Sequence, residues 1–306
     1  MPKLLFVVAL MAGLVFAQSP TITSVVNGGD FSFGIAQGGF GTIFGTGLSD
    51  KEYVGQSVPY AAKLGKTEVR FCVGSGASRA AWDNCLVSGV VYAGPGQVNF
   101  RAPIPLITSE PVGSFVLRRD GIEAVAAPSL LFRRKPSVFF VGFDCDYEPS
   151  TGDPTPCGLR STRANVTNSI RGAITDIRGA VVTSLNPARA EGWYTIWLTG
   201  MGPISNGRTV YEAGMRLDGI PVYGLPGRTF QLISPAFSGE SPQFPGLNQF
   251  NFQLPKTLLG SRLFPCGQTF KLDLALTVFS DFGNTNTAAE YVELPVLIQP
   301  GDVACQ

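Results

Sequence analysis

The chain has 306 residues, with 23 Lys and Arg, 22 Asp and Glu and no histidine. This balance lacks the basic excess that nucleic-acid binding needs, and the absence of histidine excludes Ser-His-Asp and Cys-His catalysis and histidine metal ligands. The 37 glycines, 23 prolines and 22 phenylalanines favour short strands joined by tight turns over helices.

The chain begins with a pattern typical of a secretory signal peptide. Lys3 supplies the positive charge, an apolar run follows at 4–16, and Val15-Phe16-Ala17 fits the small-residue cleavage rule. The alternative is a membrane anchor, but this run is too short to span comfortably. We expect cleavage after Ala17, no membrane span in the mature chain, and a secreted, cell-surface or periplasmic protein with 22 basic and 22 acidic residues.

About seven strands are predicted in the first part of the chain. Apolar or alternating runs between turn residues place them at 21–27, 42–46, 68–73, 86–92, 97–100, 114–118 and 122–132. Asp120-Gly121 is a hairpin signal. This number and spacing of strands is typical of an immunoglobulin-like sandwich.

The rest of the chain divides into a connection and a second set of strands. The connection opens with an apolar strand at 138–143 and continues into the loop DCDYEPSTGDPTPC. Further strands are predicted at 193–199, 210–217, 230–233, 250–254, 270–279 and 291–298. We therefore expect a signal peptide at 1–17, a first sandwich at 18–135, a connecting segment with an insertion at 136–183, and a second sandwich at 184–306.

Two motifs occur twice in the chain. GFGTIFGTGL at 39–48 is echoed by GWYTIWLTGM at 192–201, and QVNFRAP at 97–103 by QFNFQLP at 249–255. A long repeat indicates one domain present twice, so Thr42 should superpose on Thr195 and Asn99 on Asn251. The predicted fold is all-β, with two tandem immunoglobulin-like β-sandwiches. We interpret the repeated Gln and Asn of the second motif as buried amides that tie a strand to a turn.

The order of these motifs resembles an uncharacterised module of secreted bacterial proteins, often C-terminal in exported proteins of soil bacteria and related to IPT/TIG immunoglobulin-like domains. The similar residues are TIWLTGMGPISNG at 195–207 and FPGLNQ at 244–249, and in the first half IFGTGL at 43–48 and QVNF at 97–100. The resemblance spans about residues 24–300. It implies tandem β-sandwiches in an extracellular setting and brings no catalytic residue. The chain departs from it in the Cys145–Cys157 insertion and the Cys266–Cys305 tail.

An even number of cysteines indicates disulfides in an exported protein. The six cysteines permit 15 connectivities, and proximity along the chain favours Cys72–Cys85, Cys145–Cys157 and Cys266–Cys305. The chain has no C-x-x-C spacing and no histidine, which argues against zinc.

Two loops are candidate sites. Asp144, Asp146, Glu148 and Asp153 could converge on calcium, although a solvated, disulfide-closed loop without a metal is the alternative that we favour, and we expect no cofactor. The loop between Cys72 and Cys85 carries Trp82 beside Arg79 and Asp83, residue types that suit a contact site. The favoured alternative is that Trp82 folds back and caps the edge of the sandwich.

Trp193, Thr195 and Trp197 alternate onto one face of a predicted strand. Such a strip can be a sugar platform, but we interpret it as core because the strand is apolar on both faces. We expect an exported, non-catalytic structural or binding module with an unknown extracellular protein or glycan as partner. The alternatives are a carbohydrate-binding or adhesive cell-surface protein, for which exposed aromatic residues would be the sign, and a glycoside-acting enzyme with paired carboxylates.

Overall fold

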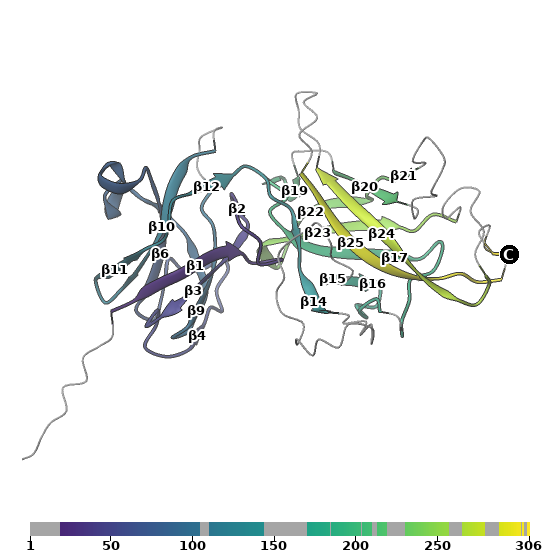
Figure 1. Ribbon diagram of the computed structural model, residues 1–306, viewed down its shortest axis with the longest axis horizontal. Helices are drawn as coiled ribbons and strands as arrows, with labels where there is room; N and C mark the ends of the chain where they lie inside the picture. The colour runs from purple at the N-terminus through teal and green to yellow at the C-terminus, as the bar shows by residue number, and fades with distance from the viewer. Residues whose placement is uncertain are drawn as a thin grey trace, which may run out of the picture.

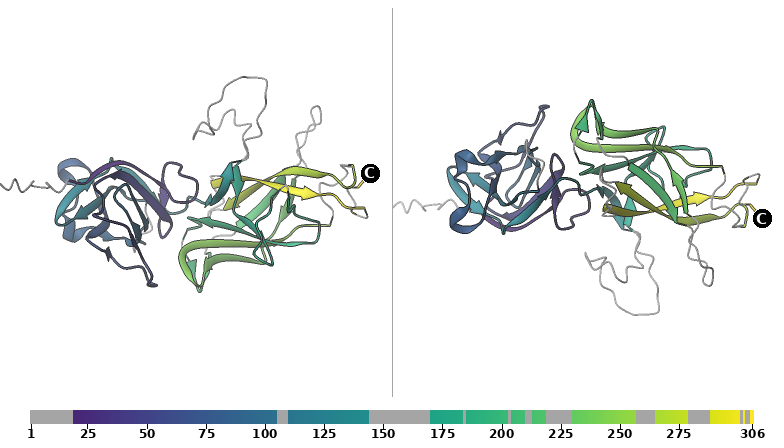
Figure 2. Two further views of the ribbon diagram at one scale, coloured as in Figure 1. Left: turned by 90° about the horizontal axis from the view of Figure 1, so that it is seen from below. Right: turned by 90° about the horizontal axis from the view of Figure 1, so that it is seen from above.

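The computed structural model describes residues 19–104, 110–143, 170–183, 185–202, 204–209, 213–218, 230–256, 265–278, 288–300, 302 and 305–306. These residues form four β-sheets and two short 3-10 helices. The sheets make two β-sandwiches that lie end to end in an elongated molecule (Figures 1 and 2). The predicted all-β class and the tandem sandwiches are confirmed. No helix in the described part of the chain has the length and apolar character to cross a membrane.

The first sandwich has two facing sheets. The five-stranded sheet has the order β1 (Thr21–Asn27), β3 (Phe40–Thr46), β9 (Gln97–Arg101), β8 (Gly89–Ala93) and β4 (Tyr53–Val54). The seven-stranded sheet has the order β2 (Ile35–Ala36), β12 (Ser129–Phe132), β10 (Val112–Arg119), β6 (Thr67–Val73) and β5 (Lys63–Leu64), with β11 (Ile122–Val125) beside β10 and β7 (Leu86–Val87) beside β6. The 3-10 helices η1 (Gly76–Ser78) and η2 (Trp82–Asn84) lie between β6 and β7.

The second sandwich repeats this plan. One sheet has the order β13 (Ser137–Val138), β17 (Trp193–Thr199), β23 (Phe244–Gln253), β22 (Phe237–Ser241), β19 (Arg208–Thr209) and β18 (Ile204–Ser205), with β16 (Ile174–Asp176) beside β17. The other has the order β14 (Phe140–Phe143), β15 (Ile170–Gly172), β25 (Ala288–Leu297), β24 (Thr269–Val278), β20 (Ala213–Asp218) and β21 (Phe230–Ile233).

Each sandwich buries one face of its repeated strand pair. In the first, Ile43 of β3 and Phe100 of β9 are fully buried, and the Phe100 ring packs 4.9 Å from that of Phe115 on the opposite sheet. In the second, Ile196 of β17 and Phe252 of β23 take the same places in the core. Successive side chains of a strand point to opposite faces of the sheet, so the residues on either side of these buried ones lie on the outer face.

The strand register confirms the predicted duplication. Thr42 lies opposite Asn99 in the pairing of β3 with β9, and Thr195 lies opposite Asn251 in the pairing of β17 with β23. The neighbouring pairs agree as well, because Phe44 faces Gln97 and Trp197 faces Gln249. A shift of one residue would reverse every side chain, so a shared register gives the two sandwiches the same inner and outer faces.

Most predicted strands are present, and the differences have local causes. The predicted strands at 21–27, 193–199 and 230–233 coincide with β1, β17 and β21. The predicted single strand at 122–132 is divided into β11 and β12 on either side of Pro128, which has no N–H to donate to a strand ladder.

The segment expected as a connection, 136–183, contributes strands to the second sandwich. Ser137 of β13 pairs with Thr199, and Ile174 of β16 pairs with Ile196, so both strands flank β17. Together they take the position that β1 has beside β3 in the first sandwich. The residue boundaries between the two units remain a prediction.

The sandwiches meet through their repeated motifs. Thr199, at the end of β17, is fully buried; its Oγ1 accepts a hydrogen bond from the Phe40 N–H at 2.7 Å and donates to the Gly246 carbonyl at 2.9 Å. An ion pair of 2.6 Å joins Arg101 of β9 to Glu240 of β22. A Cβ on Gly39 would lie 3.2 Å from the Gly200 Cα, so the two backbones approach closely there. The end of the second unit's motif therefore packs on the start of the first unit's motif.

Candidate functional site

The predicted contact loop folds back onto the first sandwich. The Cys72–Cys85 disulfide closes it with a Cα–Cα distance of 4.4 Å. Trp82, in η2, is only 6% exposed and packs with both cysteines and Val116 in a small cluster of buried residues. Val116 and Cys72 belong to β10 and β6, and they lie on the face of that sheet that points away from the main core.

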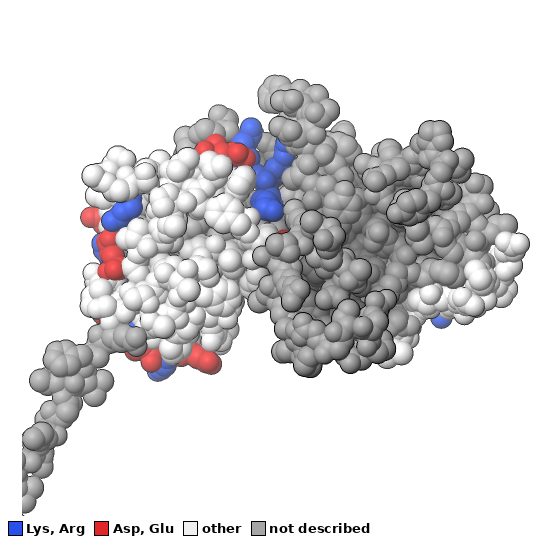
Figure 3. Space-filling model, viewed as in Figure 1, with Lys and Arg blue, Asp and Glu red and all other residues white. Residues whose placement is uncertain are grey.

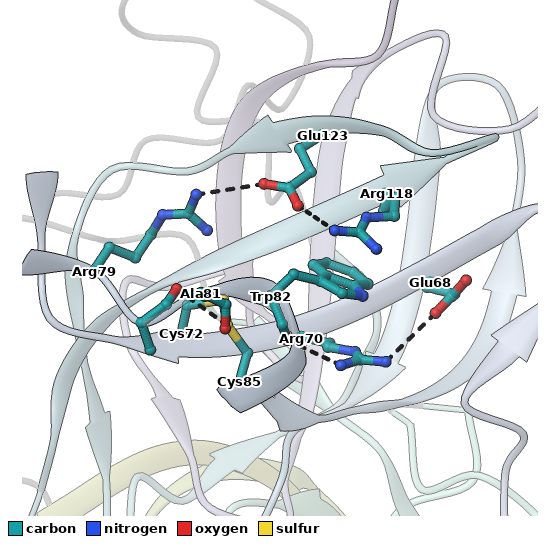
Figure 4. Close-up of polar contacts among 10 residues, drawn as sticks. Glu68, Arg70, Cys72, Arg79, Ala81, Trp82, Cys85, Arg118 and Glu123 are labelled. Atoms are coloured by element: carbon teal, nitrogen blue, oxygen red, sulfur yellow. Dashed lines mark hydrogen bonds and ion pairs between the residues drawn. A yellow bond between two sulfur atoms is a disulfide. The ribbon is translucent and has the colours of Figure 1, made fainter. Parts of the chain in front are cut away.

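Two guanidinium groups stack on Trp82. The Arg118 guanidinium carbon lies 3.9 Å from the centroid of the Trp82 ring, and that of Arg70 lies 4.5 Å away (Figure 4). Arg70 also donates a hydrogen bond of 2.9 Å to the Trp82 carbonyl. Cations are attracted to the negative faces of an aromatic ring, so both arginines hold the indole in place.

Acidic residues neutralise this arginine stack. Glu123 accepts hydrogen bonds from Arg118 at 2.5 Å and from Arg79 at 3.3 Å, and Glu68 lies 3.8 Å from Arg70 (Figure 4). The hydrogen bond from Arg118 is the main reason that the pKa of Glu123 lies below its usual value, with Arg79 adding to it.

The capping alternative thus accounts for the position of Trp82. Its ring is enclosed by arginines and the disulfide, while Arg79 is paired with Glu123 and Asp83 is exposed. A ligand-binding role for Trp82, Arg79 and Asp83 remains a prediction. In this conformation such a ligand would meet Asp83 and the edge of the loop, because the indole ring is covered.

Two of the three predicted disulfides are present. Cys72 is bonded to Cys85, and Cys266 to Cys305 across 39 positions of sequence. Cys145 and Cys157 lie outside the described residues, as do the candidate calcium ligands Asp144, Asp146, Glu148 and Asp153. The calcium site therefore stays a prediction.

The outer face of β17 carries exposed aromatic surface. Tyr194, Ile196 and Leu198 are buried in the core, whereas Trp193 on the opposite face is 44% exposed. Trp197 is half-buried on the same face, and its indole N–H donates a 3.0 Å hydrogen bond to Thr175 Oγ1. The interpretation of this face as core was therefore wrong for Trp193, because only one face of β17 turns toward the opposite sheet.

Polar side chains continue this face across the sheet. Phe237 of β22, Asn251 of β23, Thr195 of β17 and Thr175 of β16 are paired in one row. Gln249 follows in the next row, opposite Trp197. We call the set comprising Thr175, Trp193, Thr195, Trp197, Phe237, Gln249 and Asn251 the outer strip. The interpretation of Gln249 and Asn251 as ties to a turn was wrong, since both are half-buried residues in the middle of a strand.

The first sandwich has the same strip, but other aromatic rings pack on its two phenylalanines, which are half-buried. Phe40 and Phe44 correspond to Trp193 and Trp197, and Phe31 covers Phe44 at a ring distance of 5.9 Å. Tyr60 and Phe139 lie 6.0 and 6.3 Å from the Phe40 ring. One of these, Phe139, comes from the junction with the second sandwich.

The polar groups of the first strip are bonded to one another. Asn99 Oδ1 accepts hydrogen bonds from Gln97 Nε2 at 2.8 Å and from Thr42 Oγ1 at 3.2 Å. In the outer strip of the second sandwich, Asn251 Oδ1 is buried and has no hydrogen-bond partner within the described residues. The two repeats therefore share their backbone plan and differ in the hydrogen bonding of these side chains.

The alternation along the strand predicted that Trp193 and Trp197 share a face, but it did not predict that Trp193 is exposed. Phe31, Tyr60 and Phe139, which cover the first strip, lie in loops or come from the other unit. The alternation of side chains along β17 was the one available signal, and exposed aromatic residues are the sign that we expected of a carbohydrate-binding protein.

Comparisons with known proteins assign no family to the chain. No protein-family model matches it, and no curated protein matches it. Among solved structures, the comparison gives the MSCRAMM ACE of Enterococcus faecalis, which binds its ligands by the collagen Hug model, at a TM-score of 0.11 and 10% sequence identity. That match covers 91% of this chain and 95% of the other. A likeness at this TM-score carries no argument about fold or function.

Proposed function

We propose that this chain is an exported, non-catalytic binding module whose contact surface is the outer strip of the second sandwich. The observation that carries the proposal is the difference between the repeats. The first sandwich covers the Phe40 and Phe44 face with aromatic side chains, whereas Trp193 is 44% exposed at the equivalent place. Exposed apolar surface set among polar groups is typical of interaction sites, and tryptophan is enriched among residues that dominate binding energy.

Export is supported by the disulfides. Cys72–Cys85 and Cys266–Cys305 would persist in an oxidising compartment and be reduced in a cytosol. The predicted signal peptide at 1–17 leads to the same location. A secreted or surface-attached protein would present the outer strip to extracellular proteins or glycans.

The near-even balance of 23 basic and 22 acidic residues favours a neutral partner over a nucleic acid. On the face of the first sandwich seen in Figure 3, the described acidic and basic residues lie in small clusters separated by broad uncharged surface. Several of these charges are paired, as in Arg79–Glu123 and Lys63–Glu68. A nucleic acid would need an extended basic surface, which the near-neutral sequence does not favour.

A purely structural spacer is the competing function, and a binding array separates the two. The mature chain and its Trp193→Ala variant would be applied to an array of extracellular proteins and glycans. Phe33→Ala is the matched control, because Phe33 is 68% exposed on the first sandwich. We expect at least one partner whose capture is lost in Trp193→Ala and kept in Phe33→Ala. An array on which no partner depends on Trp193 would contradict the proposal.

A further inference from the structure

We infer that the outer strip binds a neutral polysaccharide that lies along β17 and β23. The inference rests on the proposed function and names the ligand of that same surface. In it, Trp193 and Trp197 are platforms on which sugar rings stack, and Thr195, Gln249 and Asn251 supply hydrogen bonds to the sugar hydroxyls. Phe237 limits the strip on the side of β22.

The geometry of the strip suits an extended chain of sugars. Trp193 and Trp197 are four residues apart on one strand, so their Cα atoms are roughly 13 Å apart at the usual rise of a β-strand. Thr195 lies between them, and Asn251 lies opposite Thr195 on the neighbouring strand. Two aromatic platforms with polar groups between them present a line of contacts, which matches an oligosaccharide better than a single sugar.

The side chains of the strip match the chemistry of a sugar. The C–H faces of a pyranose ring are apolar and slightly positive, and they pack on the negative face of an indole. An amide both donates and accepts hydrogen bonds, as a sugar hydroxyl does, so Gln249 and Asn251 can bond to neighbouring hydroxyls. None of the seven residues of the strip is ionisable. Because the strip has no charges of its own, a neutral polysaccharide fits it better than an acidic one. Arg208 lies at its border with the guanidinium carbon 5.2 Å from the Phe237 ring, and the acidic comparison below tests whether this cation recruits an acidic sugar.

Asn251 Oδ1 of the strip lacks the internal hydrogen bonds that its equivalent receives in the first sandwich. In the first sandwich, Gln97 and Thr42 both donate to Asn99 Oδ1. The equivalent Gln249 and Thr195 make no such bond to Asn251 within the described residues, and Asn251 Oδ1 is left without a donor. A buried unpaired polar atom is costly, so turning the Asn251 side chain toward a ligand hydroxyl would break no hydrogen bond to Oδ1. Trp197 is nevertheless fixed in place by Thr175, which reduces the cost of ordering it on binding.

A second copy of the chain is the main rival for this surface. At the junction between the sandwiches, the end of β17 packs onto Phe40. Trp193 is the equivalent of Phe40, and the end of β3 is the equivalent of the end of β17. The end of β3 in a second molecule could therefore pack onto Trp193. The junction, however, also contains the Arg101–Glu240 ion pair. The residue equivalent to Arg101 is Gln253. Arg101 ends β9 and faces Phe40, and Gln253 ends β23 and faces Trp193. A head-to-tail contact between copies would lack this ion pair, so the polysaccharide is the better match.

Affinity electrophoresis of the mature chain in gels containing soluble polysaccharides tests this inference. The neutral polysaccharides are hydroxyethylcellulose, galactomannan, laminarin and dextran, and polygalacturonate is the acidic comparison. We expect at least one neutral polysaccharide to retard the chain and polygalacturonate to leave its mobility unchanged. The apparent affinity should fall about tenfold or more in Trp193→Ala and recover in part in Trp193→Phe.

A matched pair of variants tests the role of the amides. Gln249→Ala should weaken retardation severalfold, whereas Gln97→Ala, at the equivalent place in the strip of the first sandwich, should not. Thermal melting that matches the parent would confirm that Gln249→Ala and Trp193→Ala are folded. Equal losses in Gln97→Ala and Gln249→Ala would overturn the assignment of the site to the second sandwich.

The outcomes separate this inference from the proposed function. If no neutral polysaccharide retards the chain but a protein on the array requires Trp193, the strip is a binding surface and its ligand is not a glycan. If sedimentation shows concentration-dependent self-association that Trp193→Ala abolishes, the occupant is a second copy. If nothing depends on Trp193 in any of these assays, both the inference and the proposed function are wrong.

Discussion

Asn99 and Asn251 occupy equivalent places in the two sandwiches, but their side chains are used differently. Asn99 Oδ1 accepts two side-chain hydrogen bonds, whereas Asn251 Oδ1 has no partner within the described residues. Because the backbone pairing is the same, the difference comes from the side chains and from the loops that cover one sheet and not the other. This contrast underlies the assignment of the binding surface to the second sandwich.

Trp82→Ala should destabilise the first sandwich by about 3 kcal/mol, the lower part of the range for removing a buried tryptophan. The ring is 6% exposed and fills the space between Arg70 and Arg118, so its loss leaves a cavity and two unstacked guanidinium groups. Denaturant unfolding measures the effect, with Trp193→Ala as the control because its ring is 44% exposed. If the Trp82→Ala chain is as stable as the control, the capping role is wrong and the contact-loop hypothesis regains support.

Acid should weaken the first sandwich through Glu123. Its pKa is lowered in the folded protein, chiefly by the hydrogen bond from Arg118, so the ionised carboxylate stabilises the fold at any pH above the unfolded pKa. That contribution is lost as the pH falls through the lower, folded pKa. Glu123→Gln should be less stable than the parent at pH 7, and the difference should shrink as the pH falls through this range. A difference that stays constant down to the most acid pH would show that the carboxylate charge is not what stabilises the cluster.

Thr199→Val should weaken the junction between the sandwiches. The substitution removes a buried hydroxyl and leaves the Phe40 N–H without its acceptor, at a cost of about 1–3 kcal/mol. Calorimetry should show a lower melting temperature, and small-angle scattering a broader range of molecular dimensions. Thr46→Val is the control, since Thr46 is the repeat equivalent of Thr199 and is exposed. Equal effects of the two variants would mean that the junction does not depend on this hydroxyl.

Removing the two described disulfides should have unequal effects. The chain-entropy estimate gives about 3 kcal/mol for Cys72–Cys85 and about 4 kcal/mol for Cys266–Cys305, which closes the longer loop. Paired Cys→Ser variants, compared by thermal melting, measure both losses. Non-reducing peptide mapping of the parent should recover both pairs, and a bridge between the first and second sandwiches would contradict this connectivity.

Much of the fold could be predicted from local and repeated patterns. The spacing of the doubled motifs predicted that Thr42 is equivalent to Thr195 and Asn99 to Asn251, and the strand pairings agree with this equivalence. Alternation along β17 predicted which residues share a face. The strands β13 and β16 were harder to assign, since their place beside β17 depends on long-range pairing across an insertion.

The candidate site could be predicted only in part, because exposure is a property of the assembled molecule. Trp193 and its equivalent Phe40 both lie in a strand with apolar residues on both faces, yet Phe40 is covered by Tyr60 and by Phe139 from the other unit. Nothing in the strand sequences themselves distinguishes these cases. For Trp82 the sequence favoured a ring folded back on the sandwich, but it did not identify Arg70 and Arg118, which enclose the ring and come from other strands.

NMR of the three indole N–H groups tests the central claim most directly. The chain contains only three tryptophans, Trp82, Trp193 and Trp197, so each indole signal can be assigned with one Trp→Phe variant. On addition of cellohexaose, mannohexaose, laminarihexaose or isomaltohexaose, whichever matches the retarding polysaccharide, we predict that the Trp193 and Trp197 signals move while that of Trp82 stays in place. Unchanged Trp193 and Trp197 signals at saturating hexasaccharide, or a shift confined to Trp82, would contradict the assignment of the outer strip as the glycan-binding surface.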